Sequence, residues 1–284
     1  MSRKWPSFLL SGARDLILVD GNKTRVLHTG YGIYYGISWD KDNIYVAHRT
    51  GLHDIGPDVS MMDRNYKVTR SVPGDFSDVH QILYANDKLY ATVTSYNSIG
   101  VFDGNQTVLA NWTGVKEDKN HINSIWFDGK YFWVGYHNFV AKHGTSEYSR
   151  VVKVNQDLTT VLDAFDLGRD IHSVFVDGDL LYVGDSANGR LTVLNMKTKK
   201  ESFVDIGMWT RGIAVTDEYI LVGASIFAPR RSRLLGHGQV SLLDRETLDI
   251  VDTRVFDDVG AVMEIRVVDQ VDYAHNEIPF PGRL

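Results

Sequence analysis

The stretch His172-Ser-Val-Phe-Val-Asp-Gly-Asp-Leu-Leu-Tyr182 decides the fold, because its pattern recurs along the chain. It contains a polar residue, a short β run, a turn and a second β run. Four further copies have the same internal length: Tyr35-Gly-Ile-Ser-Trp-Asp-Lys-Asp-Asn-Ile-Tyr45, His80-Gln-Ile-Leu-Tyr-Ala-Asn-Asp-Lys-Leu-Tyr90, Asn123-Ser-Ile-Trp-Phe-Asp-Gly-Lys-Tyr-Phe-Trp133 and Arg211-Gly-Ile-Ala-Val-Thr-Asp-Glu-Tyr-Ile-Leu221. A sixth, degenerate copy begins at Met263. The starts are 39 to 52 residues apart, which is typical of four-stranded propeller blades.

The last copy lacks residues for its outer strands, and the N-terminal region supplies them. Asp15-Leu-Ile-Leu-Val-Asp20 matches the third-strand pattern, and Thr24-Arg-Val-Leu-His28 follows as a fourth strand. Either Phe8-Leu-Leu10 or Val271-Asp-Tyr273 supplies the second strand. The sequence therefore predicts an all-β fold, a single six-bladed β-propeller over residues 1–284 with four antiparallel strands per blade. The predicted blades start near 35, 80, 123, 172, 211 and 263, and residues 8–28 complete the last blade.

Two β-sandwich domains would also suit short strands separated by Gly and Asp turns. A sandwich, however, gives no reason for one register to recur five times. The propeller is therefore the favoured interpretation.

Composition narrows the class of protein further. The 284 residues are 43% hydrophobic and 23% charged, as in globular proteins. The absence of cysteine excludes a disulfide framework, a thiolate metal site and a cysteine nucleophile. A net charge of -6 argues against a nucleic-acid partner, because such binding depends on phosphate neutralisation. No apolar run has the length of a signal peptide core or a membrane span, so we expect a cytoplasmic protein without a membrane partner.

The Asp-Gly turns at 128–134 and 177–183 resemble those of six-bladed propellers of the NHL and SMP-30 lactonase type. The resemblance covers nearly the whole chain, and it is one of architecture. Such propellers include hydrolases, lyases, oxidoreductases and binding modules, so the resemblance implies the fold and no particular activity.

The first strand of each propeller blade lines the central channel, and alternate residues of a strand point the same way. The repeat register therefore predicts two inward residues at the start of each blade. These are Ile33 and Tyr35, Asp78 and His80, His121 and Asn123, Asp170 and His172, Trp209 and Arg211, and Ala261 and Met263. Further histidines follow second strands or lie in the loops beyond them: His48, His53, His137, His143 and His237. Eight of the ten histidines are thus predicted to lie on one face near one axis.

Imidazoles that converge on an axis suit a divalent transition metal such as Zn, Fe, Mn or Cu. We expect His80, His121 and His172 to bind the metal. Asp78 and Asp170 either accept the second ring N–H of a histidine or act as ligands themselves. Two alternatives stay open: a metal-free catalytic or binding site that uses Asp–His pairs, and a polar channel whose histidines only hydrogen-bond water and backbone. A lactonase of the SMP-30 type would instead need an oxygen-rich calcium cage.

Basic and aromatic residues near the predicted mouth suggest a small anionic substrate. Arg211 lies inside the ring by register, and Arg49, Arg230 and Arg231 lie in or near the long loops, where bidentate contacts to a carboxylate or phosphate are available. Trp209, Tyr35 and Asn123 complete the expected binding surface. His48 and His137 are candidates for proton transfer, and Arg211 and Tyr35 join them as candidate catalytic residues.

Two functional hypotheses from different classes follow. The first is a metal-dependent lyase or hydrolase that polarises or hydrolyses a small anionic substrate at the channel mouth. The second is a non-catalytic propeller that binds a glycan, peptide or protein partner on the same face.

Overall fold

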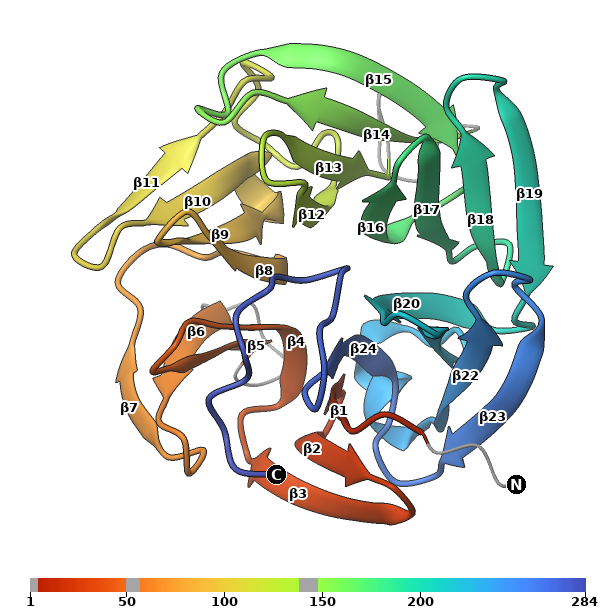
Figure 1. Ribbon diagram of the computed structural model, residues 1–284. Helices are drawn as coiled ribbons and strands as arrows, with labels where there is room; N and C mark the ends of the chain where they lie inside the picture. Colours follow the sequence, from red (N-terminus) through yellow and green to blue (C-terminus); the bar gives the residue numbers. More distant parts are fainter. Residues whose placement is uncertain (1–4, 50–56, 138–147) are drawn as a thin grey trace.

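The computed structural model describes residues 5–49, 57–137 and 148–284, in which six four-stranded antiparallel sheets surround a central axis (Figure 1). Blade 1 consists of β4(Ile33–Trp39), β5(Ile44–Arg49), β6(Pro57–Met62) and β7(Val68–Ser71). Blade 2 consists of β8(Val79–Ala85), β9(Lys88–Val93), β10(Ser98–Phe102) and β11(Thr107–Ala110). Blade 3 consists of β12(Ile122–Phe127), β13(Phe132–Tyr136), β14(Ser149–Val154) and β15(Val161–Leu167). Blades 4 and 5 are β16(His172–Asp177), β17(Leu180–Asp185), β18(Arg190–Asn195) and β19(Lys200–Asp205); and β20(Trp209–Val215), β21(Tyr219–Ser225), β22(Gly238–Asp244) and β23(Ile250–Phe256).

Blade 6 combines both ends of the chain. Its inner strand β24(Val262–Val267) pairs with β1(Phe8–Gly12), which is followed by β2(Asp15–Asp20) and β3(Lys23–Thr29). The pair Leu10 and Ile265 lies in the centre of the β1–β24 ladder. The predicted six-bladed propeller with a blade closed by both termini is therefore confirmed, and residues 8–12 provide the second strand that the sequence left open.

A β-bulge interrupts the inner strand of every blade at the same level. In blade 2 the pairing register shifts between Val79 and Ile82, and equivalent shifts occur in the other five sheets. Because a bulge breaks the two-residue alternation, consecutive residues can point to one side. The strict alternation assumed from the sequence is wrong at this level: consecutive residues such as His80 and Gln81 line the same central cavity.

Neighbouring inner strands approach closely just after the second inward residue of a blade. A Cβ on Gly36 would lie 2.5 Å from the backbone nitrogen of Ile82, and one on Gly212 would lie 2.7 Å from that of Ile265. Gly212 also has a φ of 76°, which disfavours larger residues. These two glycines let blades 1 and 5 pack against their neighbours at the axis.

A buried polar network fills the middle of the channel. The Glu264 carboxylate accepts hydrogen bonds from Gln81 Nε2 at 2.9 Å and from Arg266 Nη2 at 3.0 Å. Arg266 Nη1 also donates to the carbonyls of Ile213 and Ile265. Burial raises the pKa of Glu264, while the Arg266 charge opposes that shift. The network separates the two ends of the channel.

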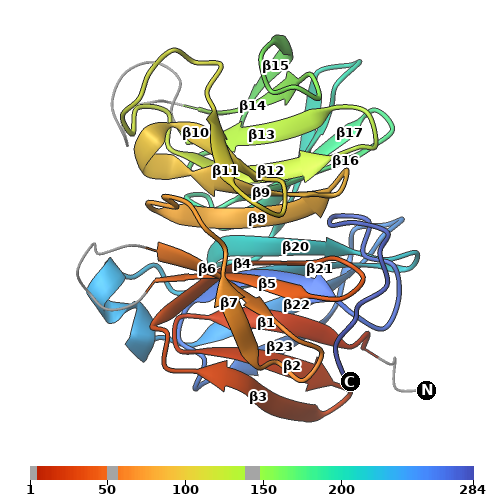
Figure 2. The same cartoon turned by 90° about the vertical axis from the view of Figure 1, so that its left-hand side faces the viewer.

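Residues 268–284, here called the C-terminal strap, cross the central opening at the end where the inner strands finish (Figure 1). Asn276 Nδ2 donates to the carbonyls of Trp39 and Tyr84, and Trp126 Nε1 donates to the carbonyl of Tyr273. The strap thus ties blades 1, 2 and 3 together. Seen from the side, it lies on the face opposite the short helices η1(Thr94–Tyr96) and η2(Arg230–Leu235) (Figure 2).

We call these two faces the strap face and the histidine face. The two predicted inward residues of each blade lie towards the histidine face, because the inner strands begin there. The part of the chain that the structure describes includes no helix with the length and hydropathy of a membrane span.

Candidate functional site

Four imidazole rings meet at the channel mouth on the histidine face. The ring centres of His80 and His121 are 5.1 Å apart, and those of His80 and His172 are 6.2 Å apart. His137, at the end of β13, lies between the other two, 4.6 Å from His121 and 4.8 Å from His172. The structure therefore brings together the three histidines expected to bind metal, with His137 as a fourth member. We refer to these four residues as the histidine cluster.

The first of the two predicted inward residues has a left-handed backbone conformation in blades 2, 3 and 4. Asp78, His121 and Asp170 have φ values of 57°, 53° and 49°, at equivalent positions of the repeat. Asp and His tolerate this region better than bulky or β-branched residues do. His121 thus reaches the cluster from the left-handed position, whereas His80 and His172 reach it from the strand that follows.

The hydrogen bonds of His172 fix its tautomer. Nδ1 lies 3.0 Å from the carbonyl oxygen of Asp170, which can only accept, so Nδ1 carries the proton. The Ser186 hydroxyl, 2.8 Å from Nδ1, donates its own hydrogen to the Thr210 carbonyl and is therefore also an acceptor for Nδ1. The lone pair is left on Nε2, which is buried and has no partner among the residues that the structure describes.

His172 is neutral at pH 7. Burial lowers its pKa well below the ordinary value, and the nearby Arg211 charge and the other rings of the cluster lower it further. A neutral imidazole with a free Nε2 lone pair is the form that binds a metal ion.

A carboxylate orients His121 in the same way. Asp118 Oδ2 lies 2.9 Å from His121 Nδ1 and accepts a hydrogen bond from it. Carboxylate–histidine pairs of this kind orient metal ligands. Asp118 was missed in the sequence because it lies in a loop outside the repeat. Its position three residues before a ring histidine was the available signal.

His137 has a different set of contacts. Asn123 Nδ2 donates to His137 Nε2 and, at 2.7 Å, to the carbonyl of Ile171. His137 Nδ1 lies 3.7 Å from Asp170 Oδ1, which is beyond hydrogen-bond distance. Asn123 therefore orients the His137 ring by a hydrogen bond, and the Asp170 carboxylate lies near its other nitrogen.

The two buried arginines of the mouth lie in different surroundings. Arg49 Nη2 forms a 2.5 Å ion pair with Asp78 Oδ1, so this carboxylate orients Arg49 and lies 4.0 Å from His80 Nε2. Arg211 places Nη1 2.7 Å from the Met263 sulfur, a weak acceptor. Both guanidinium groups add positive charge beside the histidine cluster.

Tyr35 and Trp209 line the remaining sides of the mouth. The Tyr35 ring lies 5.5 Å from that of His80, and the Trp209 ring lies 6.3 Å from that of His172 and 4.6 Å from that of Phe227. The Tyr35 hydroxyl and Trp209 Nε1 are buried and have no hydrogen-bond partner in the described parts of the chain. They are two donors available to a ligand.

The other predicted residues lie away from the cluster or outside the description. His48 stacks on Tyr31 at 4.1 Å and bonds Ser60 Oγ through Nε2 at 2.8 Å, and no described contact joins it to the cluster. Burial lowers its pKa to about 4. The side chains of Arg230 and Arg231 lie outside the described residues, as do His53 and His143.

A cavity of about 10 Å³, roughly the space of one water molecule, lies within the ring. It is lined by Tyr35, His80, Gln81, Asn123, His172, Ser173, Arg211, Met263 and Glu264. The buried Glu264 carboxylate was not predicted, because strict alternation placed it away from the channel. The sequence signal is that the residue after the second inward residue of each blade is small or polar: Gly36, Gln81, Ser124, Ser173, Gly212 and Glu264.

The cluster is close to the dimensions of a metal site. Two imidazoles bound to one metal at about 2.0–2.1 Å have ring centres roughly 4.5–5.3 Å apart for bond angles of about 90–110°. The His80–His121 separation falls in this range, and His80 and His172 are about 1 Å further apart. Within the described residues, no group of three or more His, Asp or Glu side chains has its ligand atoms already placed around one point. Metal binding would therefore draw His80 and His172 together.

Comparisons with known proteins agree on the fold. No protein-family model matches the chain, and no curated protein matches it. A chain from the crystal structure of a nidogen/laminin complex matches with a TM-score of 0.71 and 13% identity, over 94% of this chain and 100% of that chain. A protein of unknown function from Bacteroides caccae has a TM-score of 0.63 and 11% identity, over 92% and 98%. The designed protein Ika8 has a TM-score of 0.50 and 12% identity, over 93% and 75%. At these identities the likeness concerns the fold alone.

Proposed function

We propose that this protein is a metal-dependent enzyme, a lyase or hydrolase that acts on a small anionic substrate at the mouth of the channel on the histidine face. One observation carries the proposal: His172 is buried and neutral, its Nδ1 proton is committed to acceptors, and its Nε2 lone pair has no described partner. His121, oriented by Asp118, and His80 lie beside it. Together they would hold Zn, Fe, Mn or Cu.

The bound metal would supply Lewis acidity towards a substrate oxygen or water. Side chains around the cluster would bind the substrate and transfer protons. The buried positive charge of Arg211 favours an anionic group next to the cluster, and the Tyr35 hydroxyl and Trp209 Nε1 can donate hydrogen bonds to it. His137, oriented by Asn123 and close to Asp170, is the residue placed to take up or release a proton at the edge of the site.

Metal content tests the proposal most directly. A tag-free preparation is reconstituted separately with each metal, dialysed and analysed by elemental mass spectrometry. We expect about one metal per chain, and loss of that metal in His80→Ala, His121→Ala and His172→Ala. His28→Ala is the matched control, because His28 lies beside Tyr31 and Tyr34 on the outer part of blade 6 and must leave metal content unchanged. Absence of stoichiometric metal in every reconstitution would overturn the proposal.

Activity is tested on the metal-loaded protein with a panel of small carboxylates and phosphate esters. Turnover that disappears in His172→Ala and falls in Arg211→Gln supports the enzyme. A metal-loaded protein that turns over none of them, and instead retains a glycan, peptide or protein on the same face, is the result expected of the non-catalytic alternative.

A further inference from the structure

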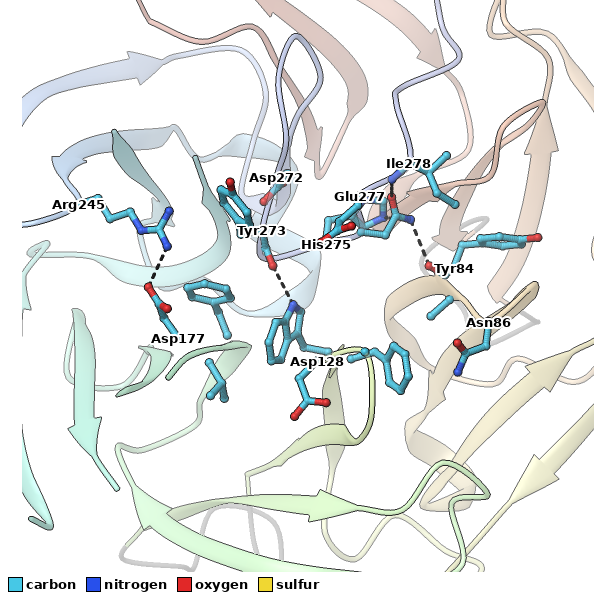
Figure 3. A pocket seen from close by; sticks show the side chains of 17 residues that line it. Tyr84, Asn86, Asp128, Asp177, Arg245, Asp272, Tyr273, His275, Glu277 and Ile278 are labelled. Carbon is cyan, nitrogen blue, oxygen red and sulfur yellow. Dashed lines mark hydrogen bonds and ion pairs between the residues drawn. The ribbon is translucent and has the colours of Figure 1, made fainter. Parts of the chain in front are cut away.

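A ligand at the histidine cluster can extend in one direction only, over the histidine face. The other end of the channel holds a pocket of about 570 Å³, bounded by the ends of the inner strands of blades 2, 3 and 4 and by strap residues 272–278 (Figure 3). This pocket shares no lining residue with the cavity in the ring. The buried pair of Glu264 and Arg266 separates the two ends. The surroundings of the cluster on its own face therefore decide which ligands fit.

A second cavity adjoins the cluster on the histidine face, at blade 5. Its volume is about 10 Å³, the space of one water molecule. It is lined by Trp209, Arg211, Ser225, Ile226, Phe227, Ala228, Arg233, Ala261 and Val262, which we call the blade-5 wall. Arg211 lines both this cavity and the cavity in the ring. An anionic group drawn to Arg211 thus lies between the cluster and the blade-5 wall.

Apolar side chains of the blade-5 wall are exposed to solvent. Phe227 is 64% exposed and Ile226 is 50% exposed. The Phe227 ring lies 4.6 Å from that of the half-buried Trp209, which in turn lies 6.3 Å from the His172 ring. Adjoining exposed apolar groups, unlike scattered ones, mark binding surfaces. A row of aromatic rings therefore leads from the cluster to solvent, and it suits a flat apolar body that lies against Phe227.

The segment that carries these side chains is fixed to the neighbouring blade. Ser225 Oγ accepts a hydrogen bond from the Val262 backbone nitrogen at 2.6 Å. The Arg233 carbonyl accepts one from the Ala261 backbone nitrogen at 2.8 Å. Both bonds join the connection between β21 and β22 to the start of β24, at the two ends of the exposed segment. The exposure of Phe227 is therefore built into the fold.

The size of the exposed surface favours a small molecule over a protein. A stable protein interface takes about 20–30 residues a side. Only two exposed large apolar side chains line the cavity of the blade-5 wall, and they continue directly into the cluster through Trp209. One aromatic ring of a ligand is enough to cover them.

We propose that the substrate of the histidine face is an arylalkyl anion, in which a short chain joins an anionic group to an aromatic ring. This inference rests on the proposed function and specifies its substrate class. The anionic group lies beside Arg211, and the aromatic ring lies against Phe227 and Trp209. Phe227 is thus a specificity-determining residue, which acts on the part of the substrate that does not react.

Three probes test the two parts of such a ligand by calorimetry on the metal-reconstituted protein at neutral pH. Hydrocinnamate has both the carboxylate and the ring, propionate lacks the ring, and hydrocinnamyl alcohol lacks the charge. We expect saturable binding of hydrocinnamate. Propionate should bind roughly tenfold more weakly, because it leaves the exposed rings uncovered. Hydrocinnamyl alcohol should also bind roughly tenfold more weakly, because it lacks the charge that a guanidinium attracts.

A matched pair of variants locates the aromatic subsite. Phe227→Ala should weaken hydrocinnamate binding roughly fivefold and leave propionate binding unchanged. Phe203→Ala is the control, because Phe203 is 62% exposed on the outer strand β19 of blade 4, and it should change neither. Arg211→Gln should weaken both acids.

The outcomes separate this inference from the proposed function. Equal binding of the two acids, equal effects of the two phenylalanine variants, or no hydrocinnamate binding to a metal-loaded protein would each overturn the arylalkyl substrate and leave the metal centre standing. Binding of hydrocinnamate that depends on Phe227 in a protein without stoichiometric metal would support the arylalkyl ligand and overturn the metal-dependent enzyme.

Discussion

The two ends of the channel are built from the same six strands and differ in almost every other respect. At the histidine face, left-handed residues and bulges bring four imidazoles together, and two of them, His80 and His172, line a cavity of about 10 Å³. At the strap face, the strands end in turns, and the strap leaves a pocket of about 570 Å³ between itself and three blades. The cluster is made by the repeat, whereas the pocket is made by a segment outside it. The repeat therefore predicts only one of the two ends.

The largest expected effect is on the network that separates the two ends. Arg266→Met leaves the Glu264 carboxylate buried without its guanidinium, so we expect the free energy of unfolding to fall by about 3–5 kcal/mol in urea denaturation. The double variant Glu264→Gln/Arg266→Met should regain part of this loss, because position 264 then carries no unpaired buried charge; the buried Asp272 still loses the nearby Arg266 charge. A single variant that unfolds like the wild type would show that the network does not stabilise the channel.

The second prediction concerns the histidine face alone. Asp118→Asn removes the carboxylate that orients His121, so metal affinity should fall about 10- to 100-fold, as for other partners of metal-bound histidines. Competition with a chelator measures the change. The neighbouring exposed Glu117→Gln is the control and should bind metal like the wild type. Equal affinities of the two variants would remove Asp118 from the site.

The third prediction concerns the strap face alone. Asn276→Ala removes the hydrogen bonds to the carbonyls of Trp39 and Tyr84, each worth about 0.5–1.5 kcal/mol. Amide hydrogen exchange should become faster in residues 272–278, while metal content stays unchanged. A loss of metal in this variant would show that the two ends are coupled.

The smallest expected effect is a difference in pH dependence. His275 is neutral in the fold, with a pKa well below the ordinary 6.5, so below pH 6.5 the unfolded chain takes up a proton that the folded one does not. Stability is therefore lost as the pH falls. Burial raises the pKa of Asp272 to about 6, which acts in the opposite direction. Comparison of the wild type with His275→Gln cancels the Asp272 effect.

Thermal unfolding between pH 7.5 and pH 5.5 makes this comparison. The wild type should lose more stability than His275→Gln over the interval. Identical slopes would mean that His275 binds its proton equally well in the folded and unfolded protein.

The sequence predicted the fold well because propeller blades repeat. Turns such as Asp177-Gly178 keep one register, and the starts of the copies agree with the inner strands to within two residues. The spacing also placed His80, His121 and His172 near one another. What was missed was the bulge, whose trace in the sequence is a single small or polar residue in each blade, such as Gln81 or Glu264, where strict alternation expects a side chain that points away from the channel.

Contacts that cross between repeats were also beyond the sequence. The pairing of Asp78 with Arg49 joins blade 1 to the start of blade 2, and Asp118 acts from a loop of its own. His275 looked like an isolated histidine near the end of the chain, and only the path of the strap places it in a pocket. Such contacts depend on three-dimensional proximity that no local spacing encodes.

The closing blade has a consequence for how the protein is made. β1 is synthesised long before its partner β24, because the strands of the other five blades lie between them in the sequence. Until β24 has been made, β1 therefore presents an unpaired edge of five residues with a largely apolar sequence. Blades 2 to 4, which carry the histidine cluster, are complete long before the ring closes. The nascent chain is thus exposed to mispairing with other chains until β24 is available, and a chaperone that shields β1 would act during that interval.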